Sequence, residues 1–115
     1  MIKVVLDTNV LISSILIDKG NPYKIVNLAI EQKIQNHISL NILNELEEKL
    51  RIKFLETEEN VKKQISLIVA FSELVEIKEK IRFVNDDPKD DIVLECAVES
   101  GAEFIVTGDN KAFTS

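Results

Sequence analysis

The chain has 115 residues, 45% of them hydrophobic and 30% charged, which indicates one globular domain and excludes a disordered chain. With 20 acidic against 14 basic residues the net charge is −6, which disfavours a protein that coats nucleic acid through phosphate contacts alone. Without a signal peptide, a stretch of ~20 apolar residues or a cysteine besides Cys96, we expect a cytoplasmic protein that spans no membrane.

The hydrophobic pattern predicts strands and helices in alternation. Residues 2–6 form a continuous apolar run, which is typical of a strand covered on both faces in a parallel sheet. Asn21 as N-cap with Pro22 at the first helical position is a good helix start. In chain order we expect a strand at 2–6, helices at 8–17 and from 22, a strand at 37–40, helices at 42–50 and 57–72, a strand at 74–77, a loop at 78–88, a helix at 90–100 and a buried strand at 104–106. This alternation implies an α/β fold with right-handed crossovers.

Acidic side chains stand where the predicted strands end. Asp7 directly follows the first strand, Asp109 closes the Thr-Gly-Asp segment after the last one, and Glu45 lies in the first turns of the helix after the second strand. Ligands of open parallel sheets bind outside the carboxyl ends of the strands, so these acids are expected to converge there. Four more aspartates lie near the start of the last helix: Asp86, Asp87, Asp90 and Asp91.

The helical projection favours one of these four. Apolar residues of the last helix fill one broad arc: Ile92, Val93, Leu94, Cys96 and Ala97. Asp90 falls within this arc, whereas Asp91 falls outside it beside Glu95. An acid on an inward face is poorly solvated unless a cation compensates it. We therefore favour Asp90 as a metal ligand and interpret Asp91 as its solvated neighbour.

Carboxylates that converge without basic partners repel one another, and they are usually relieved by protonation or by a hard cation. A magnesium ion in such a site supports hydrolysis of phosphodiester bonds. The ordinary alternatives are that an aspartate after a strand caps a helix and that Glu45 is a surface residue. His37 is interpreted as a strand residue, Cys96 as core, and Lys49 and Lys53 as part of a solvated helix face.

At this point the motifs resemble those of a known family. The segment VVLDTNVL around Asp7 resembles the start of PIN-domain proteins. The segments DPKDDIVLECA and GAEFIVTGD resemble the second half of the PIN group that forms the toxins of toxin–antitoxin systems, the VapC-like ribonucleases. In that pattern the acid seven places before the alanine is a metal ligand, which is Asp90 here, and Glu45 matches the family's second acid.

The resemblance implies a three-layer α/β/α PIN fold and a Mg²⁺- or Mn²⁺-dependent endoribonuclease that is often restrained by an antitoxin. PIN toxins commonly form homodimers, and we expect one here. The catalytic residues would be Asp7, Glu45, Asp90 and Asp109, with Asp7, Asp90 and Asp109 as metal ligands and Asn9 and Thr107 as supporting residues.

The chain departs from the family at its end. Family members usually continue beyond the Thr-Gly-Asp segment with another helix and a fifth strand, whereas this sequence stops at Ser115. Ala112 and Phe113 stand where another polar or acidic residue is common. We therefore expect a truncated domain over 1–115, with a sheet in the order 3-2-1-4 and no fifth strand. Strand 104–106 would then be an exposed edge that invites pairing with another chain.

Two other functions are compatible with parts of the sequence. A PIN module without catalytic activity could act by binding a protein or RNA. A haloacid-dehalogenase-like phosphatase also places an aspartate after its first strand, but it needs a second acid two residues later, where this chain has Asn9.

Overall fold

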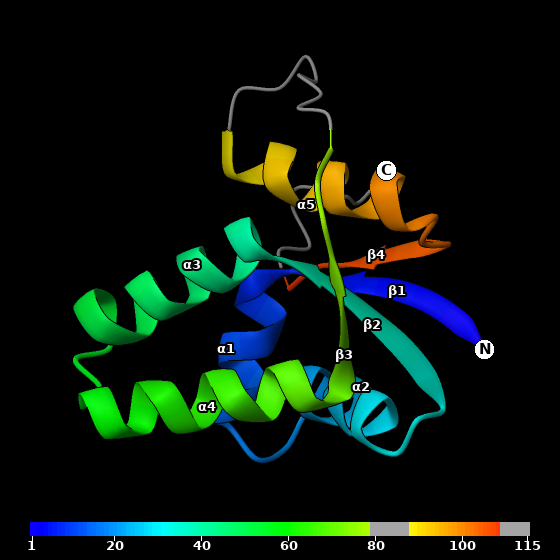
Figure 1. The fold of residues 1–115 in the computed structure, drawn as a ribbon. Coiled ribbons are helices and arrows are strands. Elements are labelled where there is room, and N and C mark those ends of the chain that lie inside the picture. Colours follow the sequence, from blue (N-terminus) through cyan, green and yellow to red (C-terminus); the bar gives the residue numbers. More distant parts are fainter. Residues whose placement is uncertain (79–87, 109–115) are drawn as a thin grey trace.

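The computed structural model describes residues 1–78 and 88–108, with side chains from residue 91 in the second range, and Figure 1 shows its arrangement. Four strands form one sheet: β1 (Ile2–Leu6), β2 (Ile34–Ser39), β3 (Ser72–Val75) and β4 (Phe104–Val106). Every neighbouring pair is parallel and the order is β3-β2-β1-β4. This confirms the predicted parallel sheet and its order. The predicted loop falls mostly on residues 79–87, which lie outside the described residues, as does the segment 109–115.

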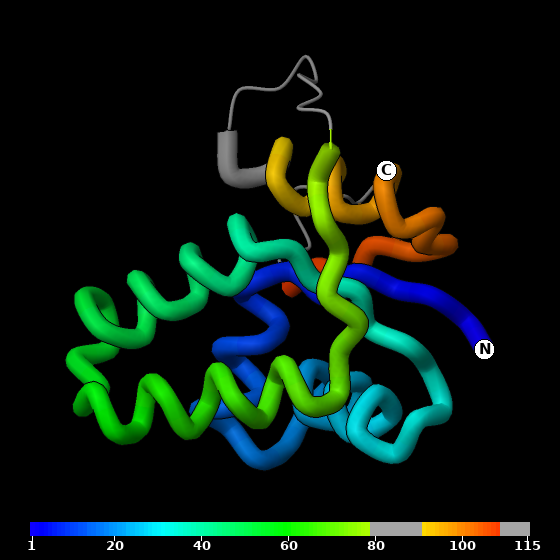
Figure 2. The backbone as a smooth tube through the Cα atoms, viewed as in Figure 1, coloured from blue at the N-terminus to red at the C-terminus, as the bar shows by residue number. Residues whose placement is uncertain are grey.

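Helices cover both faces of this sheet. They are α1 (Thr8–Leu16), α2 (Asn21–Ile30), α3 (Leu40–Glu48), α4 (Glu58–Phe71) and α5 (Pro88–Ser100), with a π-helical turn, η1 (Lys49–Lys53), directly after α3. In Figure 1, α5 lies on one side of the sheet, and α1, α2 and α4 lie on the other. Figure 2 shows the backbone turning from η1 back into α4, which packs beside α3. None of the described helices is long and apolar enough to cross a membrane.

The core is built around the central strand β1. Val4, Val5 and Leu6 are buried, as predicted for a strand covered on both faces, and each such side chain stabilises the fold by about 1.5–3 kcal/mol. Cys96 is buried too, and burial raises the pKa of its thiol to about 12, so it is an unreactive part of the core. In β4, by contrast, Phe104 is 58% exposed, because β4 is the edge of the described sheet. The prediction that residues 104–106 form a buried strand was wrong in this respect.

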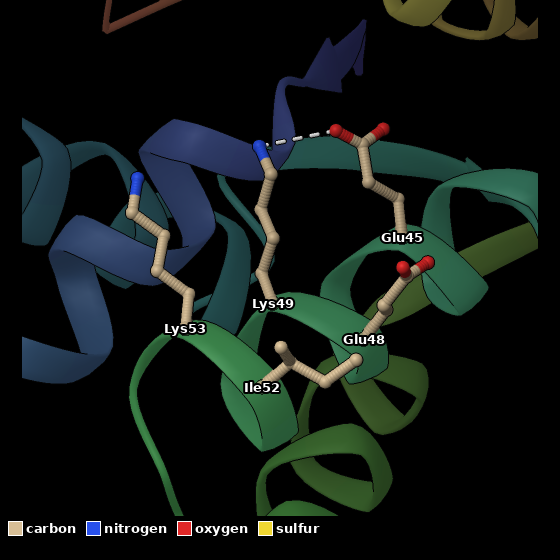
Figure 3. A pocket seen from close by; sticks show the side chains of 5 residues that line it. All are labelled: Glu45, Glu48, Lys49, Ile52 and Lys53. Carbon is tan, nitrogen blue, oxygen red and sulfur yellow. Dashed lines mark ion pairs between the residues drawn. The ribbon is translucent and has the colours of Figure 1, made fainter.

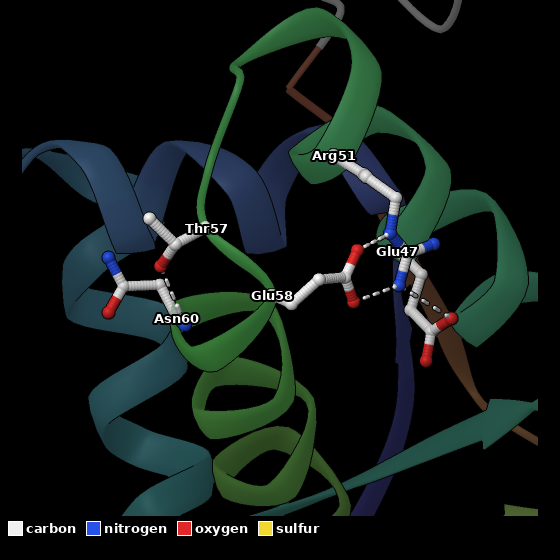
Figure 4. A network of polar contacts seen from close by, with 5 residues as sticks. All are labelled: Glu47, Arg51, Thr57, Glu58 and Asn60. Carbon is white, nitrogen blue, oxygen red and sulfur yellow. Dashed lines mark hydrogen bonds and ion pairs between the residues drawn. The ribbon is translucent and has the colours of Figure 1, made fainter.

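Local polar contacts set where the helices begin. The hydroxyl of Thr57 accepts a hydrogen bond from the backbone N–H of Asn60 over 3.1 Å and caps α4. Figure 4 shows this cap beside Arg51, which bonds Glu58 and lies 3.8 Å from Glu47, so that η1 is tied to the start of α4. Helix α2 starts one residue earlier than predicted. Gly20, whose φ of 94° suits glycine, takes the N-cap position that we assigned to Asn21.

The predicted position of the third strand was wrong by two residues. Hydrophobicity favoured 74–77, but β3 begins at Ser72, which pairs in register with Asn36 of β2. Asn36 is fully buried, accepts from the N–H of Leu6 over 2.9 Å and donates to the hydroxyl of Ser72 over 2.8 Å. A buried amide that needs partners therefore sets the position of β3 relative to β2 and β1.

Candidate active site

Asp7 is held at the carboxyl edge of the sheet, between β1, β4 and the start of α1. Its backbone N–H donates to the carbonyl of Val106 over 2.9 Å, and its own carbonyl accepts from Val10 and Leu11. Although Asp7 occupies the N-cap position of α1, its side chain makes no capping hydrogen bond. The interpretation of Asp7 as an ordinary helix cap therefore fails, although the backbone N–H of Thr8, the first residue of α1, acts on this carboxylate.

Thr107 directly follows β4 in the chain. Because Leu6 and Val106 are partners in the parallel register, the residues that follow them come out at the same edge. The Thr107 hydroxyl donates to Oδ2 of Asp7 over 3.3 Å. Two residues that directly follow β1 and β4, both predicted as site residues, thus lie in contact.

Glu45 reaches the same edge from α3, together with a lysine that we had not assigned to the site. Nζ of Lys49 lies 3.1 Å from Oε1 of Glu45 and donates to Oδ1 of Asn9 over 3.2 Å. Figure 3 shows the ion pair between Lys49 and Glu45, with Lys53 one turn further along. The side chains are only 19% exposed for Lys49 and 14% for Glu45. Lys49 is therefore not a solvated helix residue, and its spacing of four from Glu45 was the available clue in the sequence.

The electrostatics of the site centre on Asp7. Burial raises the pKa of the Asp7 carboxyl above its ordinary value, and the nearby charge of Glu45 raises it further. A hydrogen bond from the backbone of Thr8, the charge of Lys49 and the bond from Thr107 act in the opposite direction. The net effect is a carboxylate that is costly to ionise, which is the condition that a bound cation relieves.

Helix α5 carries Asp90 and Asp91, which the helical projection assigned to different faces. Glu95, on the side that we took to be solvated, is only 7% exposed, and Asp91 is partly buried. The reason is that α5 packs against all four strands and also against α3, so a wider arc of the helix is covered. The description of Asp91 as a solvated neighbour was wrong. The preference for Asp90, whose backbone lies in α5 and whose side chain is not among those described, now depends on the family resemblance.

The remaining predicted acids, Asp86, Asp87 and Asp109, lie outside the described residues. Gly108, which precedes Asp109, is described and lies beside Asn9, where a Cβ built on the glycine would be 3.9 Å from that of Asn9. In the described part of the chain, no three acidic, histidine or cysteine side chains gather closely enough to hold a metal ion. Asp7, Glu45 and the amide oxygen of Asn9 nevertheless offer the oxygen donors that Mg²⁺ and Mn²⁺ prefer. In donor chemistry the residues fit such an ion.

A cleft of about 460 Å³ leads away from this edge between α1 and η1. Polar residues, among them Asn9, Lys49 and Lys53, line the part near the site. The rest is mostly apolar, with Ile12, Leu16, Ile17 and Phe54. A smaller pocket of about 220 Å³ lies on the other side of Lys49 and includes Glu45 and Glu48 (Figure 3).

Taken together, the fold and the site define an α/β protein with acidic groups at the carboxyl edge of a parallel sheet. The sequence matches the family model described as PIN domain over residues 3–111, and the chain therefore belongs to the PIN domain family. The matched range contains the four acids predicted to be catalytic.

Two individual proteins are similar to this chain. The uncharacterized protein MJ1680 of Methanocaldococcus jannaschii is 41% identical over 115 residues, an alignment that covers 94% of this chain and 71% of that protein. Among solved structures, a chain of VapBC2 from Rickettsia felis, crystallised bound to a DNA fragment from their promoter, superposes with a TM-score of 0.70 at 16% identity. That superposition covers 96% of this chain and 90% of the other. The likeness confirms the predicted fold.

Proposed function

We propose that the chain is a metal-dependent endoribonuclease that hydrolyses RNA phosphodiester bonds, and that it acts as the toxin of a toxin–antitoxin pair. The observation that supports this most is the convergence of Asp7 and Glu45 at the carboxyl edge of the sheet, where the charge of Glu45 acts on the partly buried carboxylate of Asp7. Membership in the PIN domain family supports the same assignment.

In this proposal Asp7, Glu45, Asp90 and Asp109 hold one or more Mg²⁺ or Mn²⁺ ions. Bound there, such an ion supplies Lewis acidity for the phosphate and a lowered pKa for the attacking water. Within the chain itself, Thr107 orients the carboxylate of Asp7 through its hydrogen bond. Asn9 is the second residue of α1, and its amide oxygen accepts from Lys49 at the same edge.

The cleft beside the site suits a single RNA strand. Lys49 and Lys53 line this cleft and bring positive charge to it. Because the net charge of the protein is −6, we expect few phosphate contacts, and we expect them in the cleft. Binding that depends on few phosphate contacts has a shallow dependence on salt. Specificity for RNA would then come from the residues that line the cleft.

We also propose a cytoplasmic protein that is bound by an antitoxin and forms a homodimer. The structural likeness to a chain of VapBC2 supports a protein partner of this kind. The exposed edge at β4, with Phe104 on its surface, offers one place for pairing. Light scattering of the purified chain at micromolar concentration gives the oligomeric state directly.

The activity is tested by incubating the protein with mixed RNA substrates, with Mn²⁺ or with EDTA. We expect cleavage only with the metal and a loss of more than about 100-fold in Asp7→Asn, because changes even outside the ligand shell cost 10- to 100-fold. Asp18→Asn is the matched control, since Asp18 is an exposed acid on the segment after α1. Asp90→Asn should lose cleavage and Asp91→Asn should keep it. Cleavage by none of the proteins, with intact RNA binding, would favour the PIN module without catalytic activity.

A further inference from the structure

The ammonium of Lys49 occupies a central position in the candidate site. It lies 3.1 Å from a carboxylate oxygen of Glu45 on α3 and 3.2 Å from the amide oxygen of Asn9 on α1. Its side chain is four-fifths buried, whereas Lys53, one turn further along η1, is exposed. A lysine that gives up this much hydration is held by specific partners.

The acids of the site require a positive charge nearby. The charge of Glu45 disfavours ionisation of Asp7, and the charge of Lys49 acts on Asp7 in the opposite sense. Beside Glu45 and Asn9, the ammonium of Lys49 supplies part of the positive charge that a divalent cation would supply.

We infer that Lys49 is the internal counter-ion of the metal-free site: it holds Glu45 and Asn9 together, and it has to move away from them when a divalent cation binds. This inference rests on the proposed metal-dependent function. It makes Lys49 a positioning residue that lowers the affinity for the metal.

The side chain of Lys49 has space to move, because cavities lie on both sides of it. Lys49 starts the π-helical turn η1, in which the N–H of Phe54 donates to the carbonyl of Lys49 over 3.1 Å. Leu50 anchors this turn in the core. Lys49 itself lines both the 460 Å³ cleft and the 220 Å³ pocket, so a displaced ammonium has space on either side without a backbone change. Single π-helical turns are frequent at functional sites.

The first test measures the dissociation constant of Mn²⁺ by isothermal titration calorimetry. Lys49→Met removes the charge but keeps the length of the side chain, and we expect it to bind Mn²⁺ about tenfold more tightly, because one charge within 4–6 Å shifts cation binding by at least that factor. Lys53→Met is the matched control, with the same charge change on the same turn, and its affinity should stay within about twofold of the wild type. Unchanged or weaker binding by Lys49→Met, or equal tightening in both variants, overturns the inference.

A second measurement separates this inference from the proposed function. In EDTA, Lys49→Met should melt several degrees below the wild type, and the loss should be much smaller when Glu45→Gln is already present. If the wild type binds no Mn²⁺, the proposed function fails and the competition with metal fails with it. Suppose that the wild type binds Mn²⁺ but that Lys49→Met lowers the melting temperature in EDTA equally with and without Glu45→Gln. The counter-ion role of Lys49 alone is then overturned.

Discussion

The hydroxyl of Thr107 donates to Oδ2 of Asp7 over 3.3 Å and joins the ends of two neighbouring parallel strands. This bond favours the ionised form of Asp7, in opposition to burial, which is the largest effect on its pKa. The contact therefore links the position of β4 to the charge state of the candidate metal ligand.

Thr107→Val should raise the pKa of the Asp7 carboxyl further, because the variant removes a donor to the carboxylate while keeping the shape of the side chain. The measurement is an NMR titration of the Asp7 carboxyl carbon in EDTA. Thr107→Ser keeps the hydroxyl and should titrate like the wild type. In the presence of Mn²⁺ we expect RNA cleavage by Thr107→Val to fall about tenfold. An unchanged titration in Thr107→Val would show that the bond does not form in solution.

Asp7→Asn should stabilise the metal-free protein at neutral pH. The pKa of Asp7 is raised above its ordinary value of 3.8 in the folded state, so the folded protein holds this proton more tightly than the unfolded chain does. The wild type therefore loses stability as the pH rises from 3.8 through the folded pKa, and at pH 7 the whole cost is present. We expect Asp7→Asn in EDTA to melt a few degrees higher than the wild type at pH 7.

Mn²⁺ should reverse this order, because a ligand that binds only the folded state stabilises the wild type by mass action and Asp7→Asn binds it poorly. Thermal melts of both proteins, with EDTA and with millimolar Mn²⁺, give the comparison. The exposed Asp18→Asn serves as the control for a simple change of net charge. If Asp7→Asn melts lower than the wild type in EDTA, the Asp7 carboxylate stabilises the metal-free fold, contrary to our expectation.

Asn36→Ala should destabilise the fold more than Ser72→Ala does. Asn36→Ala leaves the buried N–H of Leu6 unpaired and also removes the donor to Ser72, which together cost about 2–3 kcal/mol, or roughly 8–12 °C in melting temperature. Ser72→Ala removes only one of the two bonds and should cost about 1 kcal/mol. Urea denaturation of both variants measures the difference. Equal losses would mean that the Leu6–Asn36 bond contributes nothing.

The sequence allowed the order of the sheet, the central position of β1 and the contact between the ends of β1 and β4 to be predicted. The order of the strands, with β1 inside the sheet, came from the resemblance to PIN-domain proteins, whereas the burial of β1 and the shared edge follow from apolar runs and from the rule that parallel strands end at one edge. Lys49, Asn36 and Glu95 could not be assigned in the same way. Each is a polar residue whose burial depends on a partner or a packed element elsewhere in the chain, and hydrophobic periodicity carries no information about such partners.

His37 lies in β2, as expected, but is only 6% exposed. Within the described residues neither ring nitrogen has a hydrogen-bond partner. Burial lowers the pKa of His37 below its ordinary value of 6.5, the charge of Lys3 lowers it further, and Glu73, its register partner on β3, opposes both. The folded state therefore takes up this proton less readily than the unfolded chain.

Because of this difference, His37 should make the protein sensitive to mild acid. Stability should be full above about pH 7 and should fall as the pH drops below 6.5 toward the folded pKa, by up to about 1.4 kcal/mol for each pH unit. His37→Leu should abolish this loss between pH 7.5 and 5.5, and Glu73→Gln should enlarge it, because the variant removes a charge that favours protonation. Urea midpoints at the two pH values provide the measurement. The same acid sensitivity in wild type and His37→Leu would assign the effect to another group.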